Sequence, residues 1–372
     1  IFEGVESKLD HSAWSIFAGT GWFMGQTTPL QGIRRVKPST KITVYRSGEM
    51  PRISETTGAL SELVSPRNVN EINIEETAHN IKSSIKSFSN LWNLPYKVEL
   101  SGGRDSRVGA AAIVSSNVTN VKFSTIGTLQ GEVDIANKLM DIVKMTKQHE
   151  ITERVDASYK APLIERVLTL HHEHDGDYTP IVMKHAINPD KYFSQPSSIT
   201  IQGAGGEIAH GNYYANERWY KKINDMGEKG PFTRITTYLS SLECVPEYVH
   251  SKVQQQVYEI FSEGMDLGIS GLSLLDYFYL IERFRRWAPI GGRIDRYSPF
   301  LAPQFIRASF DLQPLQRLNN SLHTHLINFM VPEWRNIPFY KASPKERDER
   351  TVKRCERQVI FYRFDKYVFT LF

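Results

Sequence analysis

The chain contains few cysteines, no long hydrophobic run and little excess of either charge. Its two cysteines, Cys244 and Cys355, lie far apart, so we expect no secreted-type disulfide framework and a reducing, cytoplasmic compartment. No apolar run approaches the roughly 20 residues that cross a bilayer, which argues against a membrane partner. Residues 1–14 lack the basic start and apolar stretch of a signal peptide. The net charge of +4 is too small to indicate a nucleic-acid partner.

Length and composition are those of a globular protein. The 372 residues predict about two domains. Hydrophobic residues make up 40% and charged residues 23%, so a core can form without disulfides or metal. Because the chain begins with Ile1, we expect a processed or incomplete N-terminus. Glycines punctuate residues 1–65, which predicts irregular, β-rich structure with a strand at 41–45.

Predicted strands and helices alternate after residue 65. Apolar residues at helical spacing predict a helix over 66–92, with Ser65-Pro66 as its start signal. The other predicted strands are 97–100, 121–126, 149–151 and 198–202, and the other predicted helices are 108–114 and 132–143, followed by a mainly helical stretch over 213–345 that includes 272–287. This alternation predicts an α/β fold with a parallel sheet flanked by helices.

The most informative motif is the segment Ser101-Gly102-Gly103-Arg104-Asp105-Ser106, here called the glycine loop, between a predicted strand and a predicted helix. Its two glycines let backbone N–H groups approach an anion, and the helix N-terminus adds partial positive charge. The two serine hydroxyls, with Arg104 and Arg107, could donate hydrogen bonds to phosphate oxygens. Asp105 would repel phosphate unless a cation intervenes, so it predicts Mg²⁺. Taken alone, the motif could equally be a tight turn.

Further segments follow in an order typical of one enzyme family. Thr125-Ile126-Gly127 ends the second predicted strand, and a second glycine-rich loop runs from Gln202 to Tyr213. Other matched positions are Thr28 to Pro38, the acidic segment Glu132, Asp134 and Ala136, the histidine His149, and Arg296 to Leu301. With the glycine loop, these segments make the chain resemble the asparagine synthetase-like PP-loop ATP pyrophosphatases, whose relatives include β-lactam synthetases and lasso-peptide cyclases.

The resemblance implies a fold and a domain organisation. It implies a PP-loop sheet of the five-stranded, adenine nucleotide α-hydrolase-like type. Residues 66–372 would form the synthetase domain, with a helical part at about 213–345. Residues 1–65 would be a remnant of an N-terminal glutaminase-like (Ntn-type) domain.

The same resemblance implies a reaction and a site. The family adenylates a substrate carboxylate with Mg-ATP and then forms an amide with an amine or ammonia, releasing AMP and pyrophosphate. The positions carried over for ATP are Leu100, Ser101, Gly102, Gly103, Asp105, Ser106, Ile126, Gly127, Gln202 and Gly203. Asp105 and Glu207 would hold Mg²⁺, and Arg104, Lys341 and Glu207 would be catalytic. A small-molecule or peptide carboxylate and an amine would be the substrates.

Four departures from the family pattern affect the chemistry. No cysteine fits a glutaminase nucleophile, so a separate glutaminase or precursor-binding subunit is one expected partner. Glu207 replaces the usual aspartate. Ala204 replaces a glutamate that helps proton transfer, and the nearest titratable residue is His210. Asn319 or Asn320 replaces a lysine that steadies the transition state, and Lys341 is its expected substitute.

Several alternatives stay open. The chain could be a lasso-type macrocyclase or another natural-product amide synthetase, a non-catalytic nucleotide-binding subunit, or a PP-loop tRNA-modifying enzyme, although the charge and cysteines argue against the last. Residues 171–175, His-His-Glu-His-Asp, could bind a metal or have a structural role. Arg283, Arg285, Arg286, Arg293 and Arg296 could face phosphates or form a solvated helix face, and Tyr213, Tyr214, Trp219 and Tyr220 could line a pocket or belong to the core.

Overall fold

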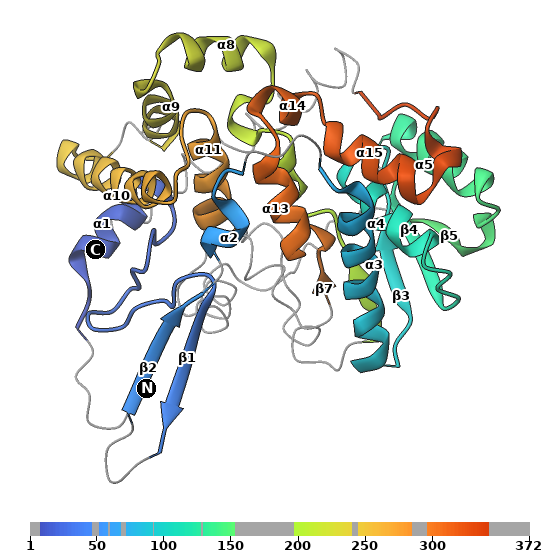
Figure 1. Ribbon diagram of the computed structural model, residues 1–372, viewed down its shortest axis with the longest axis horizontal. Helices are drawn as coiled ribbons and strands as arrows, with labels where there is room; N and C mark the ends of the chain where they lie inside the picture. The colour runs from blue at the N-terminus through green and yellow to red at the C-terminus, as the bar shows by residue number, and fades with distance from the viewer. Residues whose placement is uncertain are drawn as a thin grey trace, which may run out of the picture.

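One parallel sheet organises the fold. The computed structural model describes residues 8–46, 52–58, 60–67, 72–91, 93–127, 129–152, 197–239, 245–284 and 296–341. Five strands pair in the order β5-β4-β3-β6-β7, every neighbouring pair is parallel, and helices flank the sheet (Figure 1). Their bounds are β3 (Tyr96–Glu99), β4 (Val121–Ile126), β5 (His149–Thr152), β6 (Ile199–Ile201) and β7 (Arg296–Tyr297). The α/β prediction is therefore confirmed.

The strand order decides which loops meet. Tyr96 of β3 pairs with Val121 of β4 on one side and with Ile199 of β6 on the other. The carboxyl ends of these three strands therefore lie together, at the edge where open α/β sheets bind ligands. The four strands predicted here occur within about two residues of their expected bounds. β7 was not predicted, because two residues are too short to show alternation.

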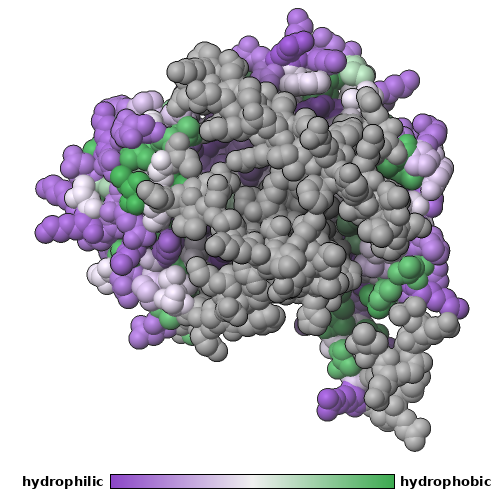
Figure 2. Space-filling view, turned by 180° about the vertical axis from the view of Figure 1, so that it is seen from behind, coloured by the Kyte–Doolittle hydropathy of each residue, from purple (hydrophilic) through white to green (hydrophobic). Residues whose placement is uncertain are grey.

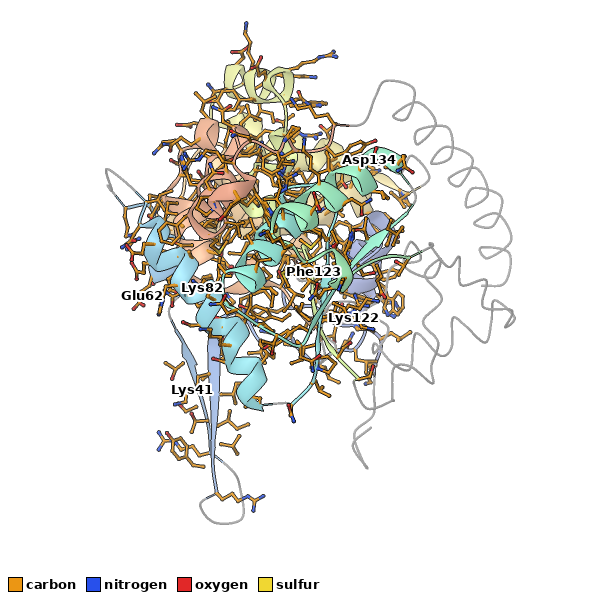
Figure 3. The ribbon with its side chains drawn as sticks, turned by 90° about the vertical axis from the view of Figure 1, so that its right-hand side faces the viewer. Lys41, Glu62, Lys82, Lys122, Phe123 and Asp134 are labelled. Atoms are coloured by element: carbon orange, nitrogen blue, oxygen red, sulfur yellow. The ribbon has the colours of Figure 1, made fainter. Side chains whose placement is uncertain are left out.

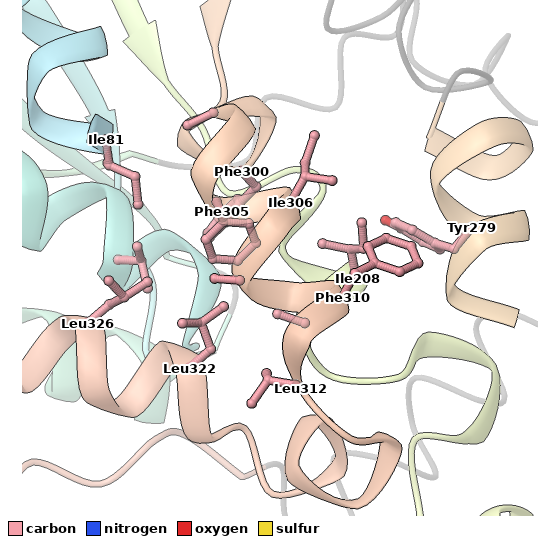
Figure 4. Close-up of a cluster of buried hydrophobic side chains, with 14 of the residues drawn as sticks. Ile81, Ile208, Tyr279, Phe300, Phe305, Ile306, Phe310, Leu312, Leu322 and Leu326 are labelled. Carbon is pink, nitrogen blue, oxygen red and sulfur yellow. The ribbon is translucent and has the colours of Figure 1, made fainter. Parts of the chain in front are cut away.

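Helices α3 (Ile74–Leu91), α4 (Asp105–Val114) and α15 (Ser321–Met330) pack against one another, whereas α5 (Gln130–Ile142) packs against β4 and β5. Small residues bring α4 close to the sheet: a Cβ on Gly109 would lie 3.1 Å from the Ile201 side chain. Figure 4 shows apolar side chains from several of these elements in one cluster, including Ile81 of α3, Leu322 of α15 and Phe305 of α13 (Pro303–Asp311).

The long helix predicted over 66–92 begins later than expected. Helix α3 starts at Ile74, where Asn73 Oδ1 accepts a hydrogen bond from the Glu76 N–H at 2.9 Å. A short separate helix, α2 (Leu60–Val64), ends before Ser65-Pro66. The prediction was wrong about the start signal because the capping side chain is that of Asn73.

The N-terminal region contains a helix that the glycine pattern did not predict. Helix α1 (His11–Thr20) starts where the Asp10 side chain accepts hydrogen bonds from two backbone N–H groups, and it ends at Gly21, whose φ is 80°. Strands β1 (Thr40–Tyr45) and β2 (Arg52–Thr57) form an antiparallel hairpin, which confirms the strand at 41–45. This hairpin, which carries Lys41, projects from the rest of the described chain (Figures 1 and 3).

The stretch after residue 213 is mainly helical, as predicted, apart from β7. The predicted helix over 272–287 is divided into α11 (Ser273–Phe278) and a π-helical turn, η5 (Tyr279–Phe284), and residues 285–287 lie outside the described part. The remaining helices are α8 (Glu217–Asp225), α9 (Lys229–Leu239), α10 (Glu247–Asp266), α14 (Pro314–Leu318) and the 3₁₀ turns η1 (Thr146–Gln148), η3 (Gly206–Ala209), η4 (Asn212–Tyr214), η6 (Pro299–Leu301) and η7 (Pro332–Trp334).

The described surface is mixed in polarity. On the face shown in Figure 2, both hydrophilic and hydrophobic described residues are exposed. Within the described ranges, no helix has both the length and the apolar character needed to cross a membrane.

Candidate nucleotide site

The glycine loop connects β3 to the first residue of α4, and its serines close it internally. Ser106 Oγ accepts a hydrogen bond from the Ser101 N–H at 3.0 Å and lies 2.8 Å from Ser101 Oγ. Ser101 Oγ in turn accepts from the Gly103 N–H at 3.1 Å. One hydroxyl proton is used between the serines, so the other is available to a ligand. The first N–H groups of α4 have no partner within the helix, which makes this end of the helix suitable for an anion.

The second glycine-rich loop packs directly on the first, because β6 is the parallel neighbour of β3. A Cβ on Gly203 would lie 2.9 Å from the Ser106 nitrogen, and a Cβ on Gly206 would overlap Asp105 Oδ1. Only glycine allows this approach. The two loops that the sequence analysis matched separately are therefore parts of one site.

Asp105 lies between two histidines. His323 Nε2 of α15 is 2.9 Å from Asp105 Oδ1, and His210 Nε2 is 3.7 Å from Oδ2. The imidazoles are not aligned for good hydrogen bonds, and Asp105 Oδ1 is buried without such a partner. Burial alone would raise the pKa of Asp105. The two histidines lower it by a larger amount, so its pKa lies well below the ordinary value. Asp105 is therefore ionised at neutral pH.

Glu207 lies at the start of η3 and is oriented by two donors. Its Oε2 accepts hydrogen bonds from the Tyr279 hydroxyl at 2.7 Å and from the Gly205 N–H at 3.2 Å. Burial raises the pKa of Tyr279, and the charges of Glu207 and Asp105 raise it further. The negative charges of Glu207 and Asp105 therefore both disfavour ionisation of the Tyr279 phenol. Tyr279 belongs to the π-helical turn η5, a feature that is frequent at functional sites.

Asp105 and Glu207 are the carboxylates of this site that would hold a magnesium ion if one is bound together with phosphate. The buried Asp105 Oδ1 lacks a hydrogen-bond partner, and Glu207 uses only Oε2 in the contacts given above. Among the described residues, no group of three or more His, Cys, Asp or Glu side chains is arranged to hold a metal. Mg²⁺ commonly takes one or two carboxylates and completes its shell with substrate phosphates and water, so two carboxylates would be enough here.

A later segment, Ile337–Tyr340, covers part of the glycine loop. The Tyr340 N–H donates to the Gly102 carbonyl at 2.8 Å, and a Cβ on Gly102 would lie 2.6 Å from the Tyr340 Cβ. Lys341 follows immediately and is exposed. The structure therefore brings the segment next to Lys341, one of the predicted catalytic residues, against the loop.

Arg107 does not have the orientation predicted for it. Its guanidinium, on a residue only 1% exposed, donates to the carbonyls of Ile337 at 2.7 Å, Pro338 at 2.9 Å and Gly102 at 3.2 Å. It also lies 4.5 Å from the centre of the Phe339 ring. Burial lowers the pKa of Arg107 to about 10, so it stays charged at neutral pH. The expectation that Arg107 binds phosphate is wrong, because its Nη1 and Nη2 groups donate to carbonyls of the covering segment and of Gly102.

Several other residues predicted to bind ATP lie at the carboxyl ends of β3 and of the two strands beside it. Ile126 ends β4 and is half exposed, and the Gly127 N–H donates to the Thr152 carbonyl at 2.9 Å. Gln202, after β6, donates its N–H to the Tyr297 carbonyl at 3.0 Å. Leu100 is buried and supports the loop from below. Arg104 immediately precedes α4 and lies close enough to influence the pKa of His323.

Several other residues considered as candidate site residues are buried or contact protein side chains. Tyr213 and Tyr214 are buried, which confirms their core interpretation, and Arg283 donates to the Tyr238 hydroxyl at 3.1 Å. Arg296 of β7 lies 4.0 Å from Glu99. Outside the described residues lie Cys244, Cys355, the cluster 171–175 and the arginines Arg285, Arg286 and Arg293.

Sequence reasoning missed His323 and Tyr279. His323 lies one helical turn after Asn319 and Asn320, the positions matched to the family lysine, and this proximity was the only signal for it. Tyr279 lay inside a predicted helix, and periodicity does not reveal a π-helical turn.

Comparison with known proteins adds no assignment: no protein-family model matches the chain, and no curated protein matches its sequence significantly.

Proposed function

We propose that this chain is an ATP-dependent, AMP-forming carbon–nitrogen ligase with a PP-loop fold, similar to the synthetase part of asparagine synthetase. One observation carries the proposal. Two glycine loops meet at the carboxyl ends of adjacent parallel strands, where a Cβ on Gly206 would overlap Asp105 Oδ1 and Glu207 accepts a hydrogen bond from the Tyr279 hydroxyl at 2.7 Å. Backbone N–H groups at the start of a helix, beside two carboxylates, would suit a magnesium–nucleotide complex.

Each part of the site has a role in binding ATP. The N–H groups of the glycine loop and of the start of α4 would receive the phosphates, and Ile126 and Gly203 would flank the adenine. Asp105 and Glu207 would hold Mg²⁺, which supplies positive charge beside the phosphates when it is bound. Arg104 and Lys341 would stabilise the negative charge that develops on pyrophosphate as it leaves.

The reaction balances in two steps. A carboxylate oxygen of the substrate attacks the α-phosphorus of ATP, the bond to pyrophosphate breaks, and an acyl-adenylate forms. An amine nitrogen then attacks the acyl carbon, AMP leaves, and the amine loses a proton. Ala204 cannot accept that proton, and its carbonyl accepts a hydrogen bond from the Ser298 hydroxyl. His210, which lies in the same loop as Ala204 and 3.7 Å from Asp105, is a candidate for this task.

The test is exchange of labelled pyrophosphate into ATP with Mg²⁺ and a panel of small and peptide carboxylates. The peptides cover the macrocyclase alternative. In the Asp105→Asn variant we expect exchange to fall by about 100- to 1000-fold, the loss typical of removing one preorganised electrostatic group. Asp225→Asn is the control, because Asp225 is an exposed aspartate at the end of α8 and belongs to none of the segments matched to the family.

Two results would change the proposal. Tight ATP binding without exchange for any carboxylate would favour a non-catalytic nucleotide-binding subunit. A fully active Asp105→Asn enzyme would remove Asp105 from the metal site. Circular dichroism of each variant separates loss of chemistry from loss of fold.

A further inference from the structure

Arg107 is a buried cation with an unusual set of partners. Its donors reach three backbone carbonyls and, among the described residues, it has no ion pair with a carboxylate. Burying a charge is costly unless it is well hydrogen-bonded, so this arrangement needs the carbonyls of Ile337 and Pro338 in place. Arg107 therefore fixes the position of that segment.

The partners of Arg107 connect two parts of the proposed site. Gly102 belongs to the glycine loop, whereas Ile337 and Pro338 belong to the covering segment. Phe339 stacks on the guanidinium, and Tyr340 pairs with the Gly102 carbonyl. Tyr340 also fills the space over Gly131 of α5, where a Cβ would lie 2.6 Å from its ring. Ile337, Pro338 and Phe339 are thus held against Arg107 and Tyr340 against the loop, and the next residue is Lys341.

We propose that Arg107 is a positioning residue that holds the segment Ile337–Tyr340 over the glycine loop and so presents Lys341 to the phosphates of the nucleotide. The inference rests on the proposed function, because it needs a nucleotide in the loop. It differs from that function by assigning a task to a residue that touches no substrate. Its buried charge also adds positive potential beneath the phosphate position.

The experiment measures how fast Lys341 is acylated by an amine-reactive reagent, with peptide mass spectrometry as the readout, with and without Mg-ATP. In the wild-type protein we expect Mg-ATP to slow Lys341 acylation by about tenfold, the size of one hydrogen bond to a charged group. Lys222, an exposed lysine of α8, is the internal reference and should not change. In Arg107→Met, protection should fall below about twofold because the segment is released.

A matched control is available elsewhere in the chain. Arg307 is also a buried arginine that donates to carbonyls of a distant segment, those of Glu62 and Ser65, both at 2.7 Å. Arg307 also donates to Asp311 at 2.7 Å, so Arg307→Met should cost at least as much stability, yet it should leave the protection of Lys341 intact. Arg107→Lys keeps the charge with fewer donors and should give intermediate protection, which keeps the test valid if Arg107→Met folds poorly.

The outcomes separate the two claims. If wild type binds Mg-ATP, measured by equilibrium dialysis, but Lys341 is not protected, the inference is wrong and the proposed function stands. Full protection in Arg107→Met and Arg107→Lys would also overturn it. If wild type binds no Mg-ATP, the proposed function fails, and the inference fails with it.

Discussion

Two buried polar clusters in this protein differ in how completely their groups are paired. One surrounds Arg317 and Asp276, which form a close ion pair in the helical region. The Tyr214 hydroxyl donates to Asp276 at 2.6 Å, and the Arg317 Nε donates to the Ser309 carbonyl at 2.7 Å. Arg317 also reaches the Ser273 hydroxyl at 3.1 Å. We call this cluster closed, because its two opposite charges form an ion pair and accept or donate hydrogen bonds within the protein.

The other cluster, Asp105 with His210 and His323, is not closed. Both nitrogens of each buried imidazole and Asp105 Oδ1 lack hydrogen-bond partners. Leaving buried polar groups unpaired costs stability, so such groups indicate either strain or a missing ligand. We infer that the Arg317 cluster maintains the fold, whereas the Asp105 cluster keeps polar atoms that would be available to a ligand.

The largest loss of stability should come from removing one partner of the Arg317–Asp276 ion pair. Arg317→Met would leave the Asp276 carboxylate buried without its ion-pair partner, which costs about 3–5 kcal/mol in the free energy of unfolding. Urea denaturation followed by circular dichroism measures this. The double variant Asp276→Leu/Arg317→Met removes both charges and should recover much of the loss. A loss under about 1 kcal/mol in Arg317→Met would contradict the role given to this cluster.

A smaller effect on stability, with a clear effect on activity, should follow from Gly206→Ala. The new methyl group would overlap Asp105 Oδ1, so the carboxylate must move. Overpacking of this kind costs about 1–3 kcal/mol, and pyrophosphate exchange should fall at least about tenfold. Gly109→Ala is the control, because its Cβ would meet only apolar side chains, those of Ile201 and Pro299. Equal exchange in the two variants would show that the position of Asp105 is not critical.

The sequence was sufficient to predict four of the five strands of the sheet, but not the partners of the loops that follow them. Alternating apolar residues in β3 and β4 bury Tyr96, Val98, Val121 and Phe123, and this local pattern is visible in the sequence. The glycine loop was predicted because two glycines between a strand and a helix form a local feature. Arg107, in contrast, looked like a phosphate ligand, because nothing local shows that its side chain turns toward Ile337.

His323 illustrates the same limit in the candidate site. Its contact with Asp105 depends on how α15 packs beside α4, which is a tertiary relation between distant parts of the chain. Helix α1 was missed for a different reason. Its cap, Asp10, and its final Gly21 are both present in the sequence, but the surrounding glycines favoured irregular structure. Local sequence signals therefore predicted the strands and helices, whereas tertiary packing determined which side chains meet at the candidate site.

The smallest effect concerns a third acidic group, Asp311, which like Asp276 is paired with arginine but lies nearer the surface. Burial alone would raise its pKa, but hydrogen bonds from Arg67 and Arg307 lower it below the ordinary value. A lowered pKa means that the stabilisation is present above the unfolded-state pKa of about 4 and is lost as pH falls through the folded-state pKa.

Asp311→Asn should therefore cost about 1 kcal/mol at pH 7, and the difference from wild type should shrink below about pH 4. Urea denaturation across pH measures this, with Asp225→Asn at the exposed end of α8 as control. A difference independent of pH would show that Asp311 acts through packing, which would restrict the paired-charge argument to the fully buried Arg317 cluster.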